Sequence, residues 1–546
     1  MSKILNPIFQ AKELIITYGI KPFDICQKNA KLWYYIKIIY CITFIFSNII
    51  FSNFIFNKIN KTVKKETQSK IIKKNNNELR LLIGQDTKTK ENIYLPETGL
   101  FQNFLITGTI GSGKTSSAMY PFTEQFFKYN YINPDKKIGM LILDVKGNYY
   151  EQVKKYAKKY NLLEDLTVIE LGSNITYNPL HKPNLKPTVL ANRLKTILEL
   201  FSENNSESYW LDKAEQIIAE AIKLCRLYND GYVTFTEIHK LITIPGYYAE
   251  KIGKLKELFI SNKLNIEQIY ELNTALDFFQ KEFESLDQRT NAILKSEITR
   301  ITNTFISDYN VLKTFSPKKE ELTFTGFEEV INNGKIVVLN MNIAEYKNLS
   351  KIIAAYLKLD FQTEIMMNLA KHNSRITAFI CDEYAEYVTK TDSDFFSLSR
   401  EAKCINIVST QSYSSIKNTL KDDTAVKVIC QNLINKIWFR TDDMLTIEEA
   451  QKQLGKEEKE KTSKNISESA KETKYNHLTK SLINKDSTIS ESLNLYTQTD
   501  YIYDTNFFTQ ELQTFNSLCF LSDGNKIIKP RKLRMYPYFL KKEEDI

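Results

Sequence analysis

The chain has 546 residues, of which 42% are hydrophobic and 25% charged, a composition that is ordinary for a globular protein with more than one domain. No CxxC pair occurs among its seven cysteines, which excludes the usual signatures of a disulfide framework or a zinc site. The formal net charge of +9 is compatible with nucleic acid or an anionic membrane as a partner, and equally with a solvated lysine-rich surface.

The first predicted element is a membrane span. Residues 38–56 (IIYCITFIFSNIIFSNFIF) carry no charge and are long enough to cross a hydrocarbon core as a helix. The lysines that follow directly favour a cytoplasmic location for the rest of the chain, although lysines also precede the segment. We therefore expect an N-terminal segment at 1–31, a transmembrane anchor at 32–57 and a polar linker at 58–80. A buried core helix is the alternative interpretation.

From residue 81 onward, short apolar runs recur between polar or helical stretches. Such runs, with little alternation, are typical of strands that are covered on both faces, as in a mainly parallel sheet. The runs are NFLITG (103–108), IGMLILD (138–144), LTVIEL (166–171), KIVVLNM (335–341), ITAFICD (376–382), CINIVST (404–410), NKIWFRT (435–441) and LCFLSD (518–523). The sequence therefore predicts an α/β fold with a mainly parallel central sheet.

Two segments interrupt this pattern. Residues 188–320 carry apolar side chains at helical spacing and almost no strand runs, which predicts an all-α domain inserted into the α/β fold. Residues 455–492 are polar and charged, and we expect a flexible surface loop there. The nucleotide-binding domain predicted below then comprises residues 81–187 and 321–546.

A phosphate-binding loop follows the first of the predicted strands. The stretch 105–117 (LITGTIGSGKTSS) fits the pattern G-x-x-x-x-G-K-[ST] in full, between a strand and a helix, which predicts a RecA-like P-loop domain. Glycines allow backbone N–H groups to wrap the phosphates of ATP, Lys114 would reach the β- and γ-phosphates, and Thr115 would ligate Mg²⁺. The residues expected to bind nucleotide are Gly108, Thr109, Gly111, Ser112, Gly113, Lys114, Thr115 and Ser116.

Hydrolysis requires a second, acidic site, and residues 376–388 (ITAFICDEYAEYV) provide one. The apolar run ends in Asp382, which can hold Mg²⁺ at a strand end, and in Glu383, which can polarise the attacking water as a general base. Asp144 also ends an apolar run and is a rival metal ligand. We prefer Asp382 because no glutamate follows Asp144.

Three further polar residues are candidates for the catalytic site. Gln411 follows the run at 404–410, where a side chain at the strand tip can sense the γ-phosphate. Arg400 precedes this run and could reach a neighbouring subunit, where an arginine would stabilise transition-state charge. Arg440 is the second candidate for this role.

Taken in order, the motifs resemble the coupling proteins of type IV secretion and conjugation systems, the TraG/TraD class of the FtsK/HerA-like motor superfamily. The resemblance covers residues 81–540 and rests on LITGTIGSGKTSS, LILDVKGNYY, YNPL (177–180), YWLDKAEQII, FICDEYAEY, SREAKCINIVSTQS, IWFRTDD and the tail FLSDGNKIIKPRKLRMYPYF. The chain departs from the family pattern in two ways: only one membrane span is found where two are usual, and Asn148 replaces an acidic residue.

The resemblance implies a role for each site residue and a set of partners. Asp382 and Glu383 would form the Walker B pair, and Gln411 and Arg400 would complete the site, Arg400 from an adjacent subunit. The protein would be a homo-hexamer anchored in the inner membrane, with most of the chain in the cytoplasm. Its DNA-stimulated ATP hydrolysis would deliver a relaxase-bound single strand, or an effector protein, to the secretion channel. DNA, single- or double-stranded, would be bound without sequence preference, and the all-α domain would meet DNA and accessory proteins.

Two other functions remain open at this stage. One is another motor of the same superfamily, a DNA translocase or a pilus-assembly ATPase, against which the helical insertion and the YNPL and tail motifs argue. The other is a nucleotide-gated membrane receptor or adaptor that recruits cargo without motor activity. The acidic pair, Gln411 and Arg400 argue against this second alternative.

Overall fold

The computed structural model places the chain in two compact units, Met1–Glu78 and Leu79–Ile546. The described residues are 34–35, 38–39, 42–44, 46–48, 52, 78–200, 208–260, 264–341, 343–369, 375–470, 474–478, 481–483 and 487–540. In the first unit the described residues are exposed, and all of them except Glu78 are helical. Most of the predicted span at 38–56, the segment 1–31 and nearly all of the linker lie outside the described residues. Within the described parts, none of the helices combines the length and the apolar character that a membrane crossing needs.

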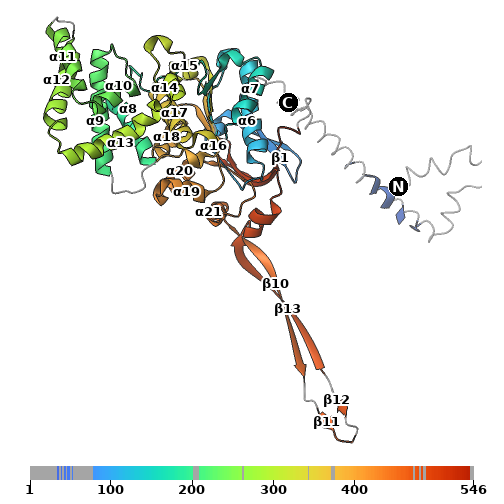
Figure 1. The fold of residues 1–546 in the computed structure, drawn as a ribbon. Coiled ribbons are helices and arrows are strands. Elements are labelled where there is room, and N and C mark those ends of the chain that lie inside the picture. The colour runs from blue at the N-terminus through green and yellow to red at the C-terminus, as the bar shows by residue number, and fades with distance from the viewer. Residues whose placement is uncertain are drawn as a thin grey trace, which may run out of the picture. The chain divides into compact units, whose positions relative to one another are not determined.

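The second unit is built around a sheet that has 11 strands among the described residues, in the order β2-β1-β15-β14-β9-β3-β8-β7-β4-β6-β5 (Figure 1). The strands from β9 to β5 in this order pair in parallel, and the others pair antiparallel at one side. The parallel strands are β3 (Phe104–Thr107), β4 (Gly139–Leu143), β5 (Leu166–Glu170), β6 (Ile336–Asn340), β7 (Thr377–Cys381), β8 (Cys404–Thr410) and β9 (Asn435–Trp438). The antiparallel strands are β1 (Arg80–Asp86), β2 (Asn92–Pro96), β14 (Asn516–Ser522) and β15 (Ile527–Arg534).

The prediction of an α/β fold with a mainly parallel sheet is confirmed. Seven of the eight apolar runs contain a parallel strand, the eighth (LCFLSD) overlaps antiparallel β14, and every residue of β3, β4, β7, β8 and β9 is buried. Burial on both faces explains why these segments show little alternation of polar and apolar residues. The antiparallel strands β1, β2 and β15 were not predicted, because they lie at or near the sheet edge and mix polar with apolar residues.

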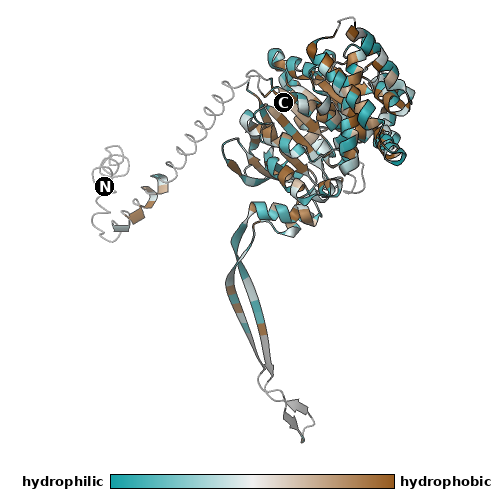
Figure 2. Ribbon diagram, turned by 90° about the vertical axis from the view of Figure 1, so that its left-hand side faces the viewer, coloured by the Kyte–Doolittle hydropathy of each residue, from teal (hydrophilic) through white to brown (hydrophobic). Residues whose placement is uncertain are grey.

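Helices cover both faces of the sheet. On one face, α6 (Tyr120–Ile132) and α7 (Tyr149–Lys159) pack against alternate residues of the central strands, such as Phe104 and Ile106. On the other face, Leu105 belongs to a larger apolar cluster that includes α17 (Asn348–Met367). In Figure 2, hydrophobic residues colour much of the ribbon of the central strands brown. This layering fixes the positions of the strand ends, where the candidate site lies.

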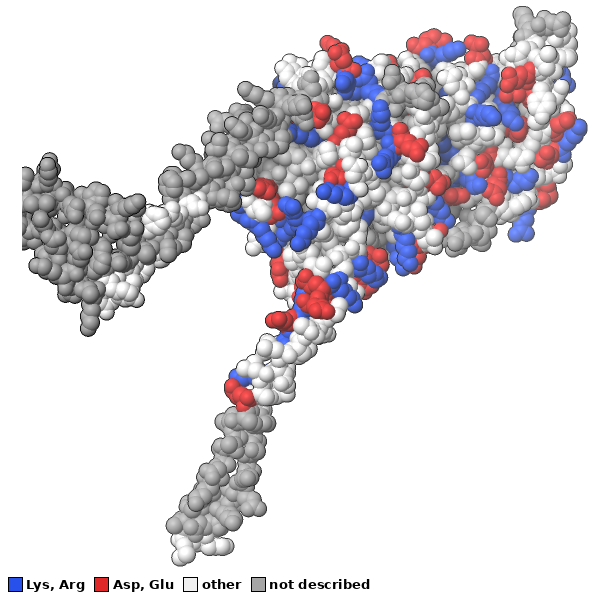
Figure 3. All heavy atoms as spheres, turned by 180° about the vertical axis from the view of Figure 1, so that it is seen from behind, with Lys and Arg blue, Asp and Glu red and all other residues white. Residues whose placement is uncertain are grey.

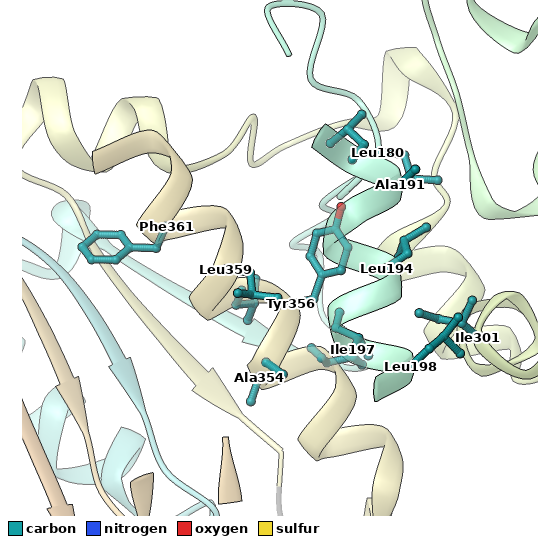
Figure 4. Close-up of a cluster of buried hydrophobic side chains, with 14 of the residues drawn as sticks. Leu180, Ala191, Leu194, Ile197, Leu198, Ile301, Ala354, Tyr356, Leu359 and Phe361 are labelled. Atoms are coloured by element: carbon teal, nitrogen blue, oxygen red, sulfur yellow. The ribbon is translucent and has the colours of Figure 1, made fainter. Parts of the chain in front are cut away.

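A group of helices follows β5 and precedes β6 in the chain. They are α8 (Pro187–Leu200), α9 (Ser208–Tyr228), α10 (Phe235–Thr243), α11 (Tyr247–Ile260), α12 (Ile266–Asp277), α13 (Gln288–Ile306) and α14 (Tyr309–Phe315), and α15 (Phe327–Asn333) then leads into β6. Leu194 and Ile197 of α8 lie beside Tyr356 and Leu359 of α17 (Figure 4). The apolar cluster is therefore continuous from these helices to the sheet.

The segment 455–492, which we expected to be a flexible loop, is a β-hairpin instead. Strand β10 (Lys456–Ala470) follows α21 (Met444–Leu454) and pairs antiparallel with β13 (Ser487–Tyr501), and shorter strands β11 (Lys474–Asn476) and β12 (Ser481–Ile483) lie between them (Figure 1). Ion pairs such as Lys461–Asp500 (2.8 Å) join the two long strands. Charged and hydroxyl side chains on a strand exposed on both faces resemble a disordered segment in composition, which explains the wrong prediction.

Candidate nucleotide-binding site

The P-loop connects the end of β3 to the helical segment that begins at Thr115 and continues into α6. The loop is held by neighbouring strand ends, since Gly108 N–H donates to the carbonyl of Gln411 (3.2 Å) and Thr109 N–H to the carbonyl of Arg440 (2.8 Å). Gly108, Gly111 and Gly113 all have positive φ angles, of 157°, 77° and 100°. Only glycine adopts such conformations readily, so the GxxxxGK spacing of the sequence is also the spacing that the backbone requires.

Lys114 lies at the centre of the loop and is buried. Its ammonium donates to the carbonyls of Gly108 and Thr109. Burial lowers the pKa of Lys114, and the negative charges of Glu383 and Asp382 oppose this shift. A buried ammonium beside the backbone N–H groups of a P-loop is suited to binding a phosphate anion.

Asp382 contacts the P-loop directly from the end of β7. Thr115 Oγ1 donates to Asp382 Oδ2 at 2.7 Å, and Ser409 Oγ of β8 donates to Asp382 Oδ1. The Asp382 backbone N–H donates to the carbonyl of Leu143 at the end of β4 (3.0 Å). The structure thus brings together the threonine and the aspartate that the sequence analysis selected as metal ligands.

Glu383 is held in an unusual backbone conformation beside Asp382. Its φ and ψ of 52° and 48° lie in the left-handed region, which costs a non-glycine residue of order 1–3 kcal/mol and is concentrated at functional sites. Its carboxylate pairs with Lys146 at 3.1 Å. Glu383 is largely buried, whereas the Lys146 side chain is half exposed. The pair thus joins a largely buried carboxylate to an ammonium that stays in contact with solvent.

Asp144 has a different environment from Asp382. Both of its carboxylate oxygens accept backbone N–H groups, from Lys146 (3.1 Å), Asn148 (3.2 Å) and Tyr149 (3.2 Å). Burial and the nearby charge of Asp382 raise the pKa of Asp144 to about 6, and the three backbone hydrogen bonds act in the opposite direction. Asp144 therefore stabilises the turn that carries Lys146, while Asp382 makes the contact with Thr115.

Gln411 and the two arginines occupy different positions. Gln411 lies at the tip of β8 and Arg440 just past β9, and both contact the P-loop through their backbone carbonyls. Arg400 is exposed in the turn after α18 (Asp392–Leu398). Among the described residues, no hydrogen bond connects the Arg400 side chain to the P-loop or to Asp382. Arg400 is therefore accessible to a neighbouring molecule, and its assignment stays a prediction.

Three contacts at this site were missed by the sequence analysis. Ser409 binds Asp382, Lys146 pairs with Glu383, and the ring of Phe515 covers Gly113. Ser409 lies near the end of a predicted strand, two residues before Gln411. The strand prediction could therefore have indicated that its side chain lies at the site. No local sequence pattern could indicate Phe515, because this residue is about 400 positions from the P-loop in a chain of 546.

The order of the parallel strands and the P-loop that follows β3 define an α/β P-loop domain. Residues 377–491, from β7 into β13, match the family model TraG-D_C, described as the TraM recognition site of TraD and TraG. The prediction of a resemblance to type IV coupling proteins of the TraG/TraD class is thereby confirmed.

Solved structures of a coupling protein share this fold. The bacterial conjugative coupling protein TrwBdeltaN70, in its trigonal form with sulphate, aligns with a TM-score of 0.56 at 12% identity and covers 84% of this chain and 94% of that one. The plasmid coupling protein TrwB in complex with ADP and Mg²⁺ aligns with a TM-score of 0.55 at 11% identity, over 84% and 95% of the two chains. At this identity the likeness concerns the fold.

One curated protein also shares a stretch of sequence with the chain. Reticulocyte-binding protein homolog 1 of Plasmodium falciparum (isolate 3D7) is 31% identical over 153 residues. The chain spans only 5% of the length of that protein. The match therefore gives no information on activity or partners.

Proposed function

We propose that the chain is an ATPase that couples ATP hydrolysis to the recruitment and transfer of DNA, or of a protein cargo, at a type IV secretion or conjugation channel. The observation that carries this proposal is the 2.7 Å contact between Thr115 of the P-loop and Asp382, with Glu383 as the next residue. This arrangement joins a phosphate-binding loop, a pair of oxygen ligands and a carboxylate base in one site.

The residues present fit a nucleotide with Mg²⁺. The Thr115 hydroxyl and the Asp382 carboxylate supply hard oxygen atoms, which Mg²⁺ prefers, and TrwB, which shares the fold, has been solved with ADP and Mg²⁺. Bound there, the ion would neutralise charge on the phosphates. Lys114 would bind the β- and γ-phosphates, and the backbone N–H groups of the loop would wrap the phosphate chain.

Glu383 is the general base of this proposal. Its carboxylate would accept a proton from the attacking water, and this role is supported by its position next to Asp382 and by the effect of its negative charge on Lys114. The side chain of Gln411, at the tip of β8, would contact the γ-phosphate. Either Arg400 or Arg440, supplied from a neighbouring subunit, would stabilise the charge of the transition state. The exposed position of Arg400 supports the first candidate, in a homo-hexamer.

The match to a TraM recognition site supports a cargo-selecting role, with a DNA-processing protein such as a relaxase as partner. Figure 3 shows lysine and arginine side chains on the second unit, interspersed with acidic ones. In the proposed function, some of these basic side chains would contact the phosphates of DNA without sequence preference, and this binding would weaken as the salt concentration rises. The uncharged segment 38–56 would anchor the protein in the inner membrane, with the bulk of the chain in the cytoplasm.

The test is ATP hydrolysis by the purified full chain with and without single-stranded DNA, beside Lys114→Ala. We expect hydrolysis by the wild type that DNA stimulates, and none by the variant. A wild type that binds ATP but never exceeds the variant in hydrolysis would favour a nucleotide-gated receptor. A hydrolysis rate that DNA neither raises nor lowers would favour a protein cargo.

A further inference from the structure

Aromatic side chains from the C-terminal part of the chain lie against the P-loop. A Cβ atom at Gly113 would lie 2.6 Å from a ring carbon of Phe515, so this ring covers the loop directly in front of Lys114. The Phe515 N–H donates to the carbonyl of Ser112 (3.2 Å), and its carbonyl accepts from Met535 N–H (2.7 Å). Phe515 thus connects the loop to the C-terminal segment.

The backbone of Phe515 is strained to make this contact. Its φ of 63° lies in the left-handed region, which is unfavourable for a bulky residue. Backbone strain of this kind persists where the surrounding contacts enforce it, and it is concentrated at ligand sites. An aromatic ring placed over a phosphate-binding loop at this cost indicates more than filling of the core.

The C-terminal segment contributes two further rings beside the loop. Tyr538 N–H donates to the carbonyl of Ser116 (2.9 Å), in the turn that follows Lys114. Its ring meets Phe539 edge to face, with the centroids 5.4 Å apart, and Phe539 meets Phe515 at 5.9 Å. Tyr538 is also supported from behind by Tyr120 of α6, at 5.3 Å. The three rings form one aromatic cluster, defined here as Phe515, Tyr538 and Phe539.

This aromatic cluster keeps a large part of its surface in solvent. Tyr538 is 38% and Phe539 57% exposed, although Tyr538 is held by a backbone hydrogen bond and both rings make aromatic contacts. Apolar ring surface that stays in solvent beside the P-loop is accessible to a ligand bound at that loop. A planar apolar ligand would cover Phe539 and gain stacking energy there.

The position of the cluster along the P-loop selects which part of a nucleotide it would meet. Asp382 meets the loop at Thr115, where the β- and γ-phosphates and Mg²⁺ are expected. The cluster meets the loop at Gly113 and Ser116 instead. The loop N–H groups cradle the α- and β-phosphates, and the ribose and base continue from the α-phosphate. The exposed rings are therefore placed for the nucleoside end of the ligand.

We propose that the aromatic cluster is the platform on which the nucleobase stacks, with Phe539 as the contacting ring and Phe515 and Tyr538 as its support. The inference rests on the proposed binding of ATP by the P-loop. Phe515 and Phe539 carry no polar side-chain atom, so the platform would recognise the flat face of a base rather than its hydrogen-bonding edge. The site would then bind ATP and GTP similarly, and both more tightly than pyrimidine triphosphates, which stack less well.

The test compares ATP with inorganic tripolyphosphate, which has the phosphates and no base. Binding of each to the full chain is measured by calorimetry with Mg²⁺, for the wild type, Phe539→Ala, Phe539→Trp and Tyr131→Ala. Tyr131 lies near the end of α6, away from the loop, and is also 57% exposed, which makes it a matched control. Loss of one stacking contact should weaken ATP binding by Phe539→Ala about tenfold.

We expect tripolyphosphate binding to be unchanged in Phe539→Ala, and Phe539→Trp and Tyr131→Ala to bind ATP as the wild type does. Equal ATP affinities of wild type and Phe539→Ala would overturn the platform while leaving nucleotide binding intact. Equal losses for ATP and tripolyphosphate would also overturn it, because the ring would then act on the loop itself. A wild type that binds neither ligand would instead refute the proposed nucleotide binding, and a thermal melt of each variant checks that it is folded.

Discussion

A buried lysine in α17 connects this helix to the segment that follows Glu383, and its removal tests how that segment is held. The Lys358 ammonium donates to Asp392 Oδ1 (2.8 Å) and Oδ2 (2.7 Å), to the Tyr387 carbonyl (2.6 Å) and to Thr389 Oγ1 (2.9 Å). Both side chains of the Lys358–Asp392 pair are completely buried. The lysine therefore binds one backbone carbonyl and one side-chain hydroxyl of the turn between Glu383 and α18.

Lys358→Met keeps the length of the side chain and leaves the Asp392 carboxylate buried without its cation. Breaking a buried pair in this way costs about 3–5 kcal/mol of unfolding free energy. Neutralising the acid as well, in Lys358→Met with Asp392→Asn, removes the uncompensated charge. Tyr384 and Gln362 can still donate to the remaining acceptor. We therefore expect the double variant to be more stable than the single one by about 1 kcal/mol or more.

Urea unfolding followed by circular dichroism measures these differences. Lys351→Met is the matched control, since Lys351 lies on the same helix, is partly exposed and pairs with Glu386 at the surface. Such a pair contributes about 0–1 kcal/mol. The reasoning is refuted if Lys358→Met costs no more than Lys351→Met, or if the costs of Lys358→Met and Asp392→Asn simply add.

Three further predictions concern the site itself. The pKa of Asp144 is raised to about 6, so the folded state retains a proton that the unfolded state releases near pH 4, and stability falls as the pH rises between these values. Asparagine does not titrate, so the unfolding free energy of Asp144→Asn minus that of the wild type should increase by about 3 kcal/mol from pH 4 to pH 7. A difference that stays constant over this range in urea titrations would contradict the raised pKa of Asp144. Gly113→Ala should abolish nucleotide binding in calorimetry, because its φ of 100° is unfavourable for alanine and its Cβ would overlap Phe515; retained affinity would mean that the loop can adopt another conformation. Lys146→Met should lower kcat of ATP hydrolysis and leave KM unchanged, since it releases the Glu383 carboxylate without touching the phosphate-binding residues; a changed KM alone would place the lysine on the nucleotide.

The parallel half of the sheet was predictable because its strands are buried on both faces. A run such as GMLIL, five apolar residues between turn signals, is too short for a helix and therefore predicts a buried strand. The P-loop pattern in addition requires a strand before it and a helix after it, which predicts β3 and the helix that follows. The antiparallel strands carried no comparable signal. In β1, exposed and buried residues are mixed, and β15 contains Pro530, which weakens any strand prediction. The hairpin β10–β13 has the composition of a disordered segment and differs from one only by its cross-strand pairing.

The candidate site was predictable where a motif has a required spacing. Lys114, Thr115 and Asp382 follow from strand ends, and the structure brings the last two within hydrogen-bond distance. Contacts between segments that are far apart in the chain were not predictable. Lys146 reaches Glu383 because β4 and β7 are adjacent in the sheet, and this order is not encoded in either segment alone. The same holds for Phe515, which meets the loop from the antiparallel side of the sheet.

The central claim is that Glu383 is the base that turns nucleotide binding into hydrolysis, and a single-turnover experiment tests it most directly. The full chain and Glu383→Gln are each mixed in excess with radiolabelled ATP and Mg²⁺, and the bound nucleotide is identified after denaturation. Glutamine has the same shape as glutamate but accepts no proton, so the variant should bind ATP and return it intact, while the wild type returns ADP. ADP formation by Glu383→Gln at the wild-type rate would contradict the account.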